Sequence, residues 1–193
     1  MNQFQHYFKL GVQHILDLNG FDHILFVIAL CAIYLLRDWK KILILVLAFT
    51  LGHSVALAVA MFQWIRINIG LIEFLIPITI AVTAFVNLLK PKPSGNSGIQ
   101  INYLFALIFG LIHGLGFSTY LRSLLGNQGS ILEPLLAFNL GLGVGQLVIV
   151  GIFLLASSVW VGIFGVNRKE WTLVVSSIVL GMALMMIVNS QFW

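Results

Sequence analysis

The sequence predicts an all-α integral membrane protein, a bundle of about six transmembrane helices preceded by a short amphipathic helix. Hydrophobic residues make up 60% of the 193 residues and charged residues only 8%, against about 45–50% and about 25% in soluble domains. So few charges could not cover the surface of a soluble fold of this size. The alternating apolar and polar strands of a membrane β-barrel are also missing from the sequence.

The same composition excludes several other classes of protein. Disordered chains are rich in charge and poor in apolar residues, the opposite of what is seen here. The formal charge of +4 comes from ten scattered Lys and Arg residues, without the basic stripe that would predict nucleic acid as a partner. The single cysteine, Cys31, lies in an apolar run, which excludes a disulfide framework and a paired-cysteine metal motif.

Residues 1–19 form the first expected element. Phe4, Tyr7 and Val12 recur at helical spacing among polar residues, which predicts an amphipathic helix lying in the membrane interface. Gly20, at the end of an Asn-Gly pair, supplies the turn that leads into the membrane.

Residues 20–191 are expected to form the helical bundle, and the whole chain 1–193 one transmembrane domain. A helix needs about 20 consecutive apolar residues to cross a bilayer. Runs of this kind, each bounded by charges or turn residues, lie at 20–36, 41–64, 70–90, 101–124, 131–156 and 170–191. Glycine-rich stretches at 110–116 and 141–145 predict close contact between helices.

The basic residues near the helix ends predict the orientation of the bundle. Seven lie in the loops after the first, third and fifth helices, against three on the opposite side. The seven are Arg37, Lys40, Lys41, Lys90, Lys92, Arg168 and Lys169, and the three are Lys9, Arg66 and Arg122. Because positive loops stay in the cytoplasm, both termini are expected outside it, in an inner (plasma) membrane of bacterial type.

Ionisable side chains inside the membrane are the best candidates for a functional site, because each costs a few kcal/mol to bury there. His53 and His113 lie near the middles of the second and fourth helices, and Asp22, His23 and Glu73 lie at outer helix ends. Imidazoles with a carboxylate are good ligands for nickel, cobalt, zinc or copper. The pattern predicts a divalent metal site in the outer half of the bundle, although each histidine could instead only bond helices together.

Two further residues lie one helical turn apart on the amphipathic segment. His14 and Asp17 could form an access lip to the metal site, or simply belong to a solvated face. The helix rise of 1.5 Å per residue places Asp22 and His23 about 10 Å further out than His53 and His113. Helix tilt or a re-entrant start of the first helix would be needed to close that gap.

Three stretches carry a resemblance to a known family. They are Gly-Phe-Asp-His-Ile-Leu-Phe at 20–26, Phe-Thr-Leu-Gly-His-Ser at 49–54 and Phe-Gly-Leu-Ile-His-Gly-Leu-Gly-Phe at 109–117. These resemble the signature stretches of HupE/UreJ-type membrane proteins, in the same order and on separate helices. An additional His-Gly step ending in Glu, found in the hydrogenase-linked members, is missing, so the chain resembles the divergent second branch of the family.

The resemblance implies permeation of nickel or cobalt. It also implies partners of the family's kind, either a second copy of the chain or proteins of metalloenzyme maturation. Carried over residue by residue, it points to Asp22, His23, His53 and His113 as the metal-handling positions.

Three functions are compatible with these residues. The first is a divalent-metal permease, which should have a polar path through both halves of the bundle. The second is an intramembrane zinc hydrolase with a closed cytoplasmic half, in which three histidines hold zinc. In that case Asp22 or Glu73 would act as general base, and Ser54 or Ser118 would steady the reacting oxygen. The third is an accessory subunit whose polar cluster only assembles the bundle.

Overall fold

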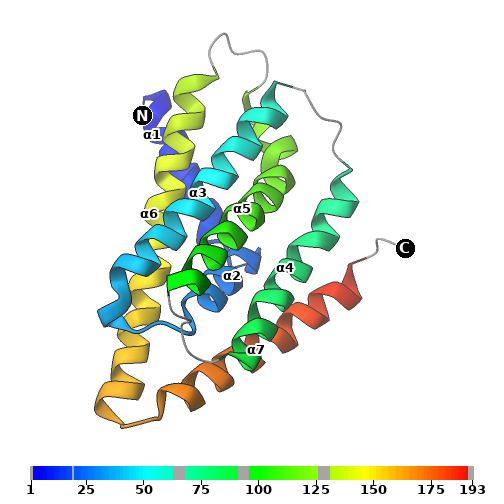
Figure 1. The fold of residues 1–193 in the computed structure, drawn as a ribbon. Coiled ribbons are helices and arrows are strands. Elements are labelled where there is room, and N and C mark those ends of the chain that lie inside the picture. The colour runs from blue at the N-terminus through cyan, green and yellow to red at the C-terminus, as the bar shows by residue number, and fades with distance from the viewer. Residues whose placement is uncertain (1, 19, 63–67, 91–95, 126–130, 191–193) are drawn as a thin grey trace.

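The computed structural model describes residues 2–18, 20–62, 68–90, 96–125 and 131–190, and this part of the chain is helical with short connections (Figure 1). The predicted all-α architecture is confirmed. The elements are α1 (Gln3–Ile15), α2 (Asp22–Cys31), a 3₁₀ turn η1 (Leu36–Asp38), α3 (Trp39–Met61), α4 (Ile69–Leu89), α5 (Asn96–Leu125), α6 (Leu132–Ser157), a π-helical turn η2 (Ser158–Ile163) and α7 (Arg168–Asn189). Arg66 and Lys92, two of the residues that predict the orientation, lie outside the described residues.

Among the described residues, five helices are long and apolar enough to cross a membrane: Leu36–Met61, Ile69–Leu89, Asn102–Leu121, Leu132–Ile163 and Arg168–Asn189. They correspond to the second through sixth predicted spans, so these five predictions are confirmed. α6 continues through the π-helical turn to Ile163, several residues past the predicted end at 156.

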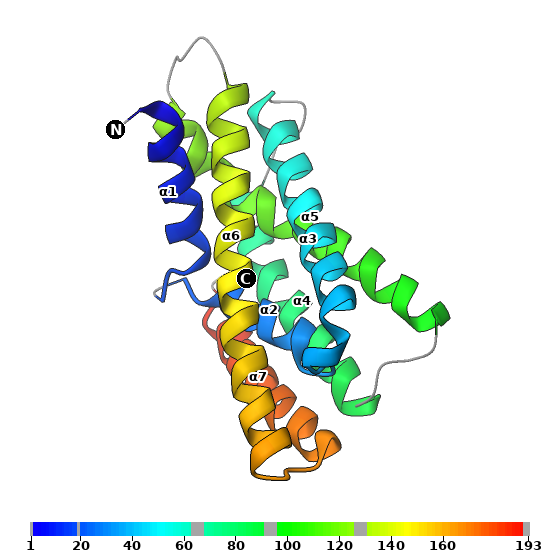
Figure 2. The same cartoon turned by 90° about the vertical axis from the view of Figure 1, so that its left-hand side faces the viewer.

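The first predicted span, 20–36, differs from a full transmembrane helix. α2 covers only ten residues, from Asp22 to Cys31, which is about 15 Å of helix against about 30 Å of hydrocarbon. α1 was expected in the interface, yet it runs beside the first half of α6 and ends where α2 begins (Figure 2). We therefore infer that α1 and α2 form one crossing in two halves.

α1 and α6 touch backbone to backbone because glycines occupy the crossing. A Cβ added at Gly11 would collide with the carbonyl oxygen of Phe138, and one added at Gly141 would collide with that of Phe8. Gly11 therefore contacts the carbonyl three residues before Gly141, and Gly141 contacts the carbonyl three residues before Gly11. Such close approach is a common way for membrane helices to associate in a lipid environment.

α3 and α5 cross in the same reciprocal way. A Cβ at Gly52 would collide with the carbonyl oxygen of Leu107, and one at Gly110 with that of Phe49. Gly114 continues the contact against the carbonyl oxygen of His53. The close contacts predicted for the two glycine-rich stretches are thus confirmed, and one of them lies directly beside a candidate ligand.

Side chains from other helices hold the end of α2. The last carbonyls of a helix have no partner within the helix, and here Asn87 of α4 donates to the carbonyl of Ala29 at 2.7 Å. Thr172 of α7 donates to the carbonyl of Ala32 at 3.0 Å. Arg168 donates to the carbonyl of Ile33 at 2.6 Å. The lower half of the first crossing is therefore anchored to α4 and α7.

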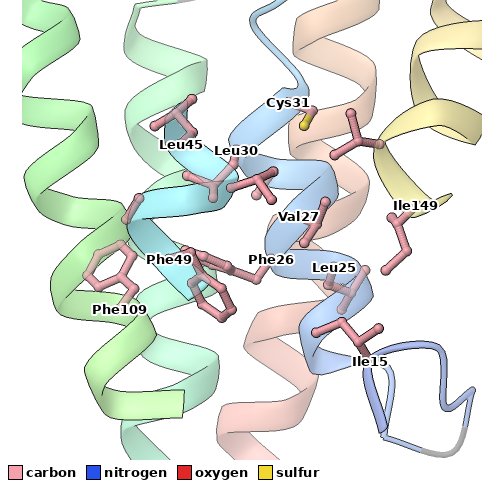
Figure 3. Packing of buried hydrophobic residues seen from close by; sticks show 14 of the residues in the cluster. Ile15, Leu25, Phe26, Val27, Leu30, Cys31, Leu45, Phe49, Phe109 and Ile149 are labelled. Atoms are coloured by element: carbon pink, nitrogen blue, oxygen red, sulfur yellow. The ribbon is translucent and has the colours of Figure 1, made fainter. Parts of the chain in front are cut away.

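The buried core surrounds α2. Phe26 packs against Phe49 with ring centroids 5.0 Å apart and against Phe109 at 5.6 Å, and Leu30 and Leu45 extend the cluster along the bundle (Figure 3). We call the end of the bundle with the N-terminus the N-terminal end. We call the opposite end the basic end, since it carries Arg37, Lys40, Lys41, Lys90, Arg168 and Lys169.

The glycine crossings give a testable prediction. Gly141→Ala should lower the stability of the detergent-solubilised protein by about 1–3 kcal/mol, because overpacking forces backbone atoms apart. Gly143→Ala is the matched control two residues away, where an added Cβ meets no described atom within 4 Å. Thermal unfolding followed by circular dichroism measures both. Equal melting temperatures for the two variants would contradict the backbone contact.

Candidate metal centre

Four histidines from four different helices converge near the middle of the bundle. His23 lies at the centre, with its ring centroid 4.6 Å from that of His14, 6.0 Å from His53 and 5.1 Å from His113. His14 and His53 are 6.1 Å apart. The structure thus brings together the three histidines predicted as ligands, and adds His14, which the sequence placed at an access lip.

The break between α1 and α2 removes the expected difference in depth. α2 begins at Asp22, and the ring of His23 lies 6.0 Å from that of His53 on α3 and 5.1 Å from that of His113 on α5, so the three histidines share one level of the bundle. The prediction that Asp22 and His23 lie about 10 Å further out is therefore wrong. It assumed a continuous first helix starting at the membrane surface.

Asp22 fixes the orientation of His23. Its Oδ1 lies 3.0 Å from Nδ1 of His23, so the ionised carboxylate accepts the Nδ1 proton and leaves Nε2 with a free lone pair. A carboxylate behind a ligating histidine holds the ring and its tautomer in this way in many metal sites. Asp22, His23 and His113 also each offer one ligand atom within 4.8 Å of the others.

Thr79 of α4 fixes the orientation of the His113 ring. The single hydroxyl proton of Thr79 is donated to the carbonyl of Ile76 at 2.7 Å. Its contact of 3.2 Å with Nε2 of His113 therefore requires the ring to donate, which leaves Nδ1 with the lone pair. The sequence analysis did not include Thr79 in the site. The signal for it would have been a hydroxyl on a facing helix at the depth of His113.

The remaining ring nitrogens have no protein partner among the described residues. They are Nε2 of His14, Nε2 of His23, both nitrogens of His53 and Nδ1 of His113. An unpaired buried polar group costs about 1–3 kcal/mol, so several together point to a ligand that binds imidazole nitrogen. Borderline transition-metal cations are such ligands, and the residues present fit one.

Aromatic rings form the walls of the centre. Phe117 lies 3.8 Å from His14 between ring centroids, and Phe138 lies 5.7 Å from the same histidine. Phe26 and Phe49 pack against His113 at 5.1 Å and 5.4 Å. These rings restrict both water and side-chain rotation, so the histidines are held in place.

A cavity adjoins the centre at the break between α1 and α2. Its polar lining residues are His14, Asp17, Asp22, His23, Glu73 and His113, and the others are apolar residues and glycines. Asp17 and Glu73 are exposed, so these two carboxylates lie at the mouth of the cavity. Glu73, which the sequence analysis grouped with the ligands, is thus placed on the approach to the centre.

The two serines considered for catalysis bond within their own helices. Ser54 donates to the carbonyl of Thr50 at 2.7 Å and Ser118 to that of Leu115 at 2.6 Å. The hydroxyl of Thr50 in turn donates to Gln146 of α6. Of these three bonds, the one between Thr50 and Gln146 joins two helices, α3 and α6.

Comparison with known proteins gives one result. A family model described as HupE / UreJ protein matches residues 1–191, which is nearly the whole chain and includes all four histidines of the centre. No curated protein and no solved structure matches the chain.

The contact between Thr79 and His113 gives a second prediction. Thr79→Val should weaken binding of Ni²⁺ or Co²⁺ by about 10–100-fold, the usual effect of removing a group that orients a metal-binding histidine. Thr79→Ser keeps the hydroxyl and should restore the affinity. Thr50→Val, which removes a hydroxyl bonded to Gln146, is the matched control. Isothermal titration calorimetry in detergent measures the affinities. Equal affinities of Thr79→Val and wild type would contradict the role of Thr79 in orienting His113.

Proposed function

The chain belongs to the HupE/UreJ family, and from this premise we propose that it is a permease for divalent transition-metal cations. The family is associated with nickel and cobalt transport. The observation that carries the proposal is the group of four histidines, of which His23, His53 and His113 are buried and His14 is half-buried. Two of them have their free nitrogen selected by a bonded neighbour. Their residue types suit Ni²⁺ and Co²⁺ as cargo.

The charge of the centre suits a transported ion. Imidazoles are neutral when they bind a cation, and Asp22 supplies the one nearby carboxylate among the ligand group. A site with one negative charge leaves a divalent cation only partly neutralised. Such a site can remove water from the ion and still release it, unlike the closed four-ligand sites that hold structural zinc.

The carboxylates that line the cavity support capture of the cation through it. Asp17, Asp22 and Glu73 gather negative charge around one opening, and such clefts raise the local concentration of cations. The positive-inside rule places the basic end in the cytoplasm. We therefore propose import across a bacterial inner membrane, with both termini outside. The second copy or maturation partner implied by the family stays a prediction.

The centre gives a third prediction, which tests the function directly. Purified protein should bind Ni²⁺ or Co²⁺ that exchanges freely and is removed by dialysis against a chelator, because the cavity leaves the ligands accessible. His53→Ala should lose the bound metal and the uptake into proteoliposomes. His6→Ala is the matched control, since His6 is exposed on α1. Elemental mass spectrometry measures the metal content before and after dialysis.

Two other results would overturn the permease. Near-stoichiometric zinc that survives the chelator and disappears in His53→Ala would indicate a resident metal, as a zinc hydrolase requires. Absence of any bound metal would leave the histidines with a purely structural role.

The cavity mouth gives a fourth prediction. Asp17→Asn and Glu73→Gln should each raise the KM for uptake about two- to tenfold, since a carboxylate at a mouth acts by attracting the cation. The effect should shrink at high ionic strength because salt screens exposed charges. Glu170→Gln, at the basic end, is the control. If uptake by the mouth variants responds to salt as wild type does, the carboxylates have no role in capture.

A further inference from the structure

A second cavity lies nearer the basic end, between α2, α3, α4 and α5. Its volume is about 30 Å³, which is room for about two water molecules. Most of its lining is apolar. Its polar residues are Tyr34, Thr83, Asn87 and Asn102.

A line of polar groups on α4 connects this cavity with the metal centre. Thr79, Thr83 and Asn87 are four residues apart, so they share one face of the helix and rise by about 6 Å at each step. The hydroxyl of Thr83 donates to the carbonyl of Thr79 at 2.8 Å, and Thr79 contacts His113. Polar atoms therefore continue from the centre toward the basic end.

The amide groups of the cavity present oxygen. The amide nitrogen of Asn87 is engaged by the carbonyl of Ala29 at 2.7 Å, and that of Asn102 donates to the hydroxyl of Tyr34 at 3.3 Å. The oxygen of each amide is thus the atom left for another partner. Neutral oxygens accept hydrogen bonds from the water molecules around a cation. They bind Ni²⁺ or Co²⁺ itself more weakly than imidazole does.

An aromatic layer separates the two sites. Phe109 lines the second cavity one turn before His113, and it packs against Phe26, which packs against Phe49 (Figure 3). The first site offers nitrogen ligands and a carboxylate, and the second offers neutral oxygens. Affinity for a transition-metal cation therefore falls in the direction of the basic end.

Resting on the permease function proposed above, we propose that this second cavity is the release site for the cation. The ion leaves the histidines past Thr79 and Thr83, takes up water among the oxygens of the cavity, and continues to the basic end. Thr83 and Asn87 are then positions that determine the rate of release without contributing to capture.

Transport and binding measured side by side test the release site. Thr83→Val and Asn87→Leu should lower Ni²⁺ uptake into proteoliposomes about tenfold, the effect of removing roughly one polar contact to the ion. Calorimetric affinity of the histidine centre for Ni²⁺ should change less than twofold. Asn139→Leu is the matched control, because Asn139 donates to the carbonyl of Leu135 within α6 and does not line either cavity.

Cysteine labelling provides a second measurement that does not depend on transport. Cys31→Ala supplies the background, and Asn87→Cys should react with a cationic, water-soluble thiol reagent applied from the basic end. Ni²⁺ should slow this reaction. Phe85→Cys, on an exposed face of α4, is the control and should react with lipid-soluble reagents alone.

The outcomes separate the two proposals. Wild-type protein that neither binds nor transports Ni²⁺ overturns the permease itself. A wild type that transports, together with Thr83→Val and Asn87→Leu variants that transport equally well, overturns the release site alone. Reaction of Asn87→Cys with lipid-soluble reagents only would show that the cavity opens to acyl chains, which also overturns it.

Discussion

The structure depends on two places where helix backbones touch. Gly11 and Gly141 join α1 to α6, and Gly52 and Gly110 join α3 to α5, each pair with the same reciprocal contact between a glycine and a carbonyl. The metal centre follows from these crossings. His14 and His113 each stand three residues after a crossing glycine, and His53 stands one residue after another. Because rigid backbones meet at these points, the imidazoles of His14, His53 and His113 are positioned by helix packing, while His23 is held by its bond to Asp22.

Hydrogen bonds to the histidines set the orientation of rings that the helix crossings bring together. Asp22 and Thr79 approach from different sides and each occupies one nitrogen of a ring, which leaves the other nitrogen facing the cluster. Helix packing thus sets where the rings lie, and hydrogen bonds set which atom each ring presents. A cation that prefers nitrogen ligands can then bind without first rearranging the side chains, which keeps the binding and release steps fast relative to a site that must assemble.

The sequence predicted the bundle because long apolar runs leave few other structures possible. It also predicted His23, His53 and His113 as one site, since ionisable residues within apolar membrane helices are rare. His14 was harder to place, because its helix alternates polar and apolar faces and resembles a surface helix. The packing of α1 on α6 depends on Gly11 and Gly141, which are far apart in the chain. Thr79 carried no signal of its own, since its role depends on which face of α4 meets α5.

The division of the first crossing between α1 and α2 also has an electrical consequence. Backbone groups at a helix break inside a bilayer are tolerated where they line a hydrated cavity or lie within protein, and here Asp17, Gly20 and Asp22 at the break line a cavity. On the proposed function and orientation, water filling that cavity would carry the potential of the outer solution to the histidines. The membrane voltage then falls mainly across the lower half of the bundle. A divalent cation gains about 4.6 kcal/mol per 100 mV in crossing that half, so voltage drives release far more strongly than capture.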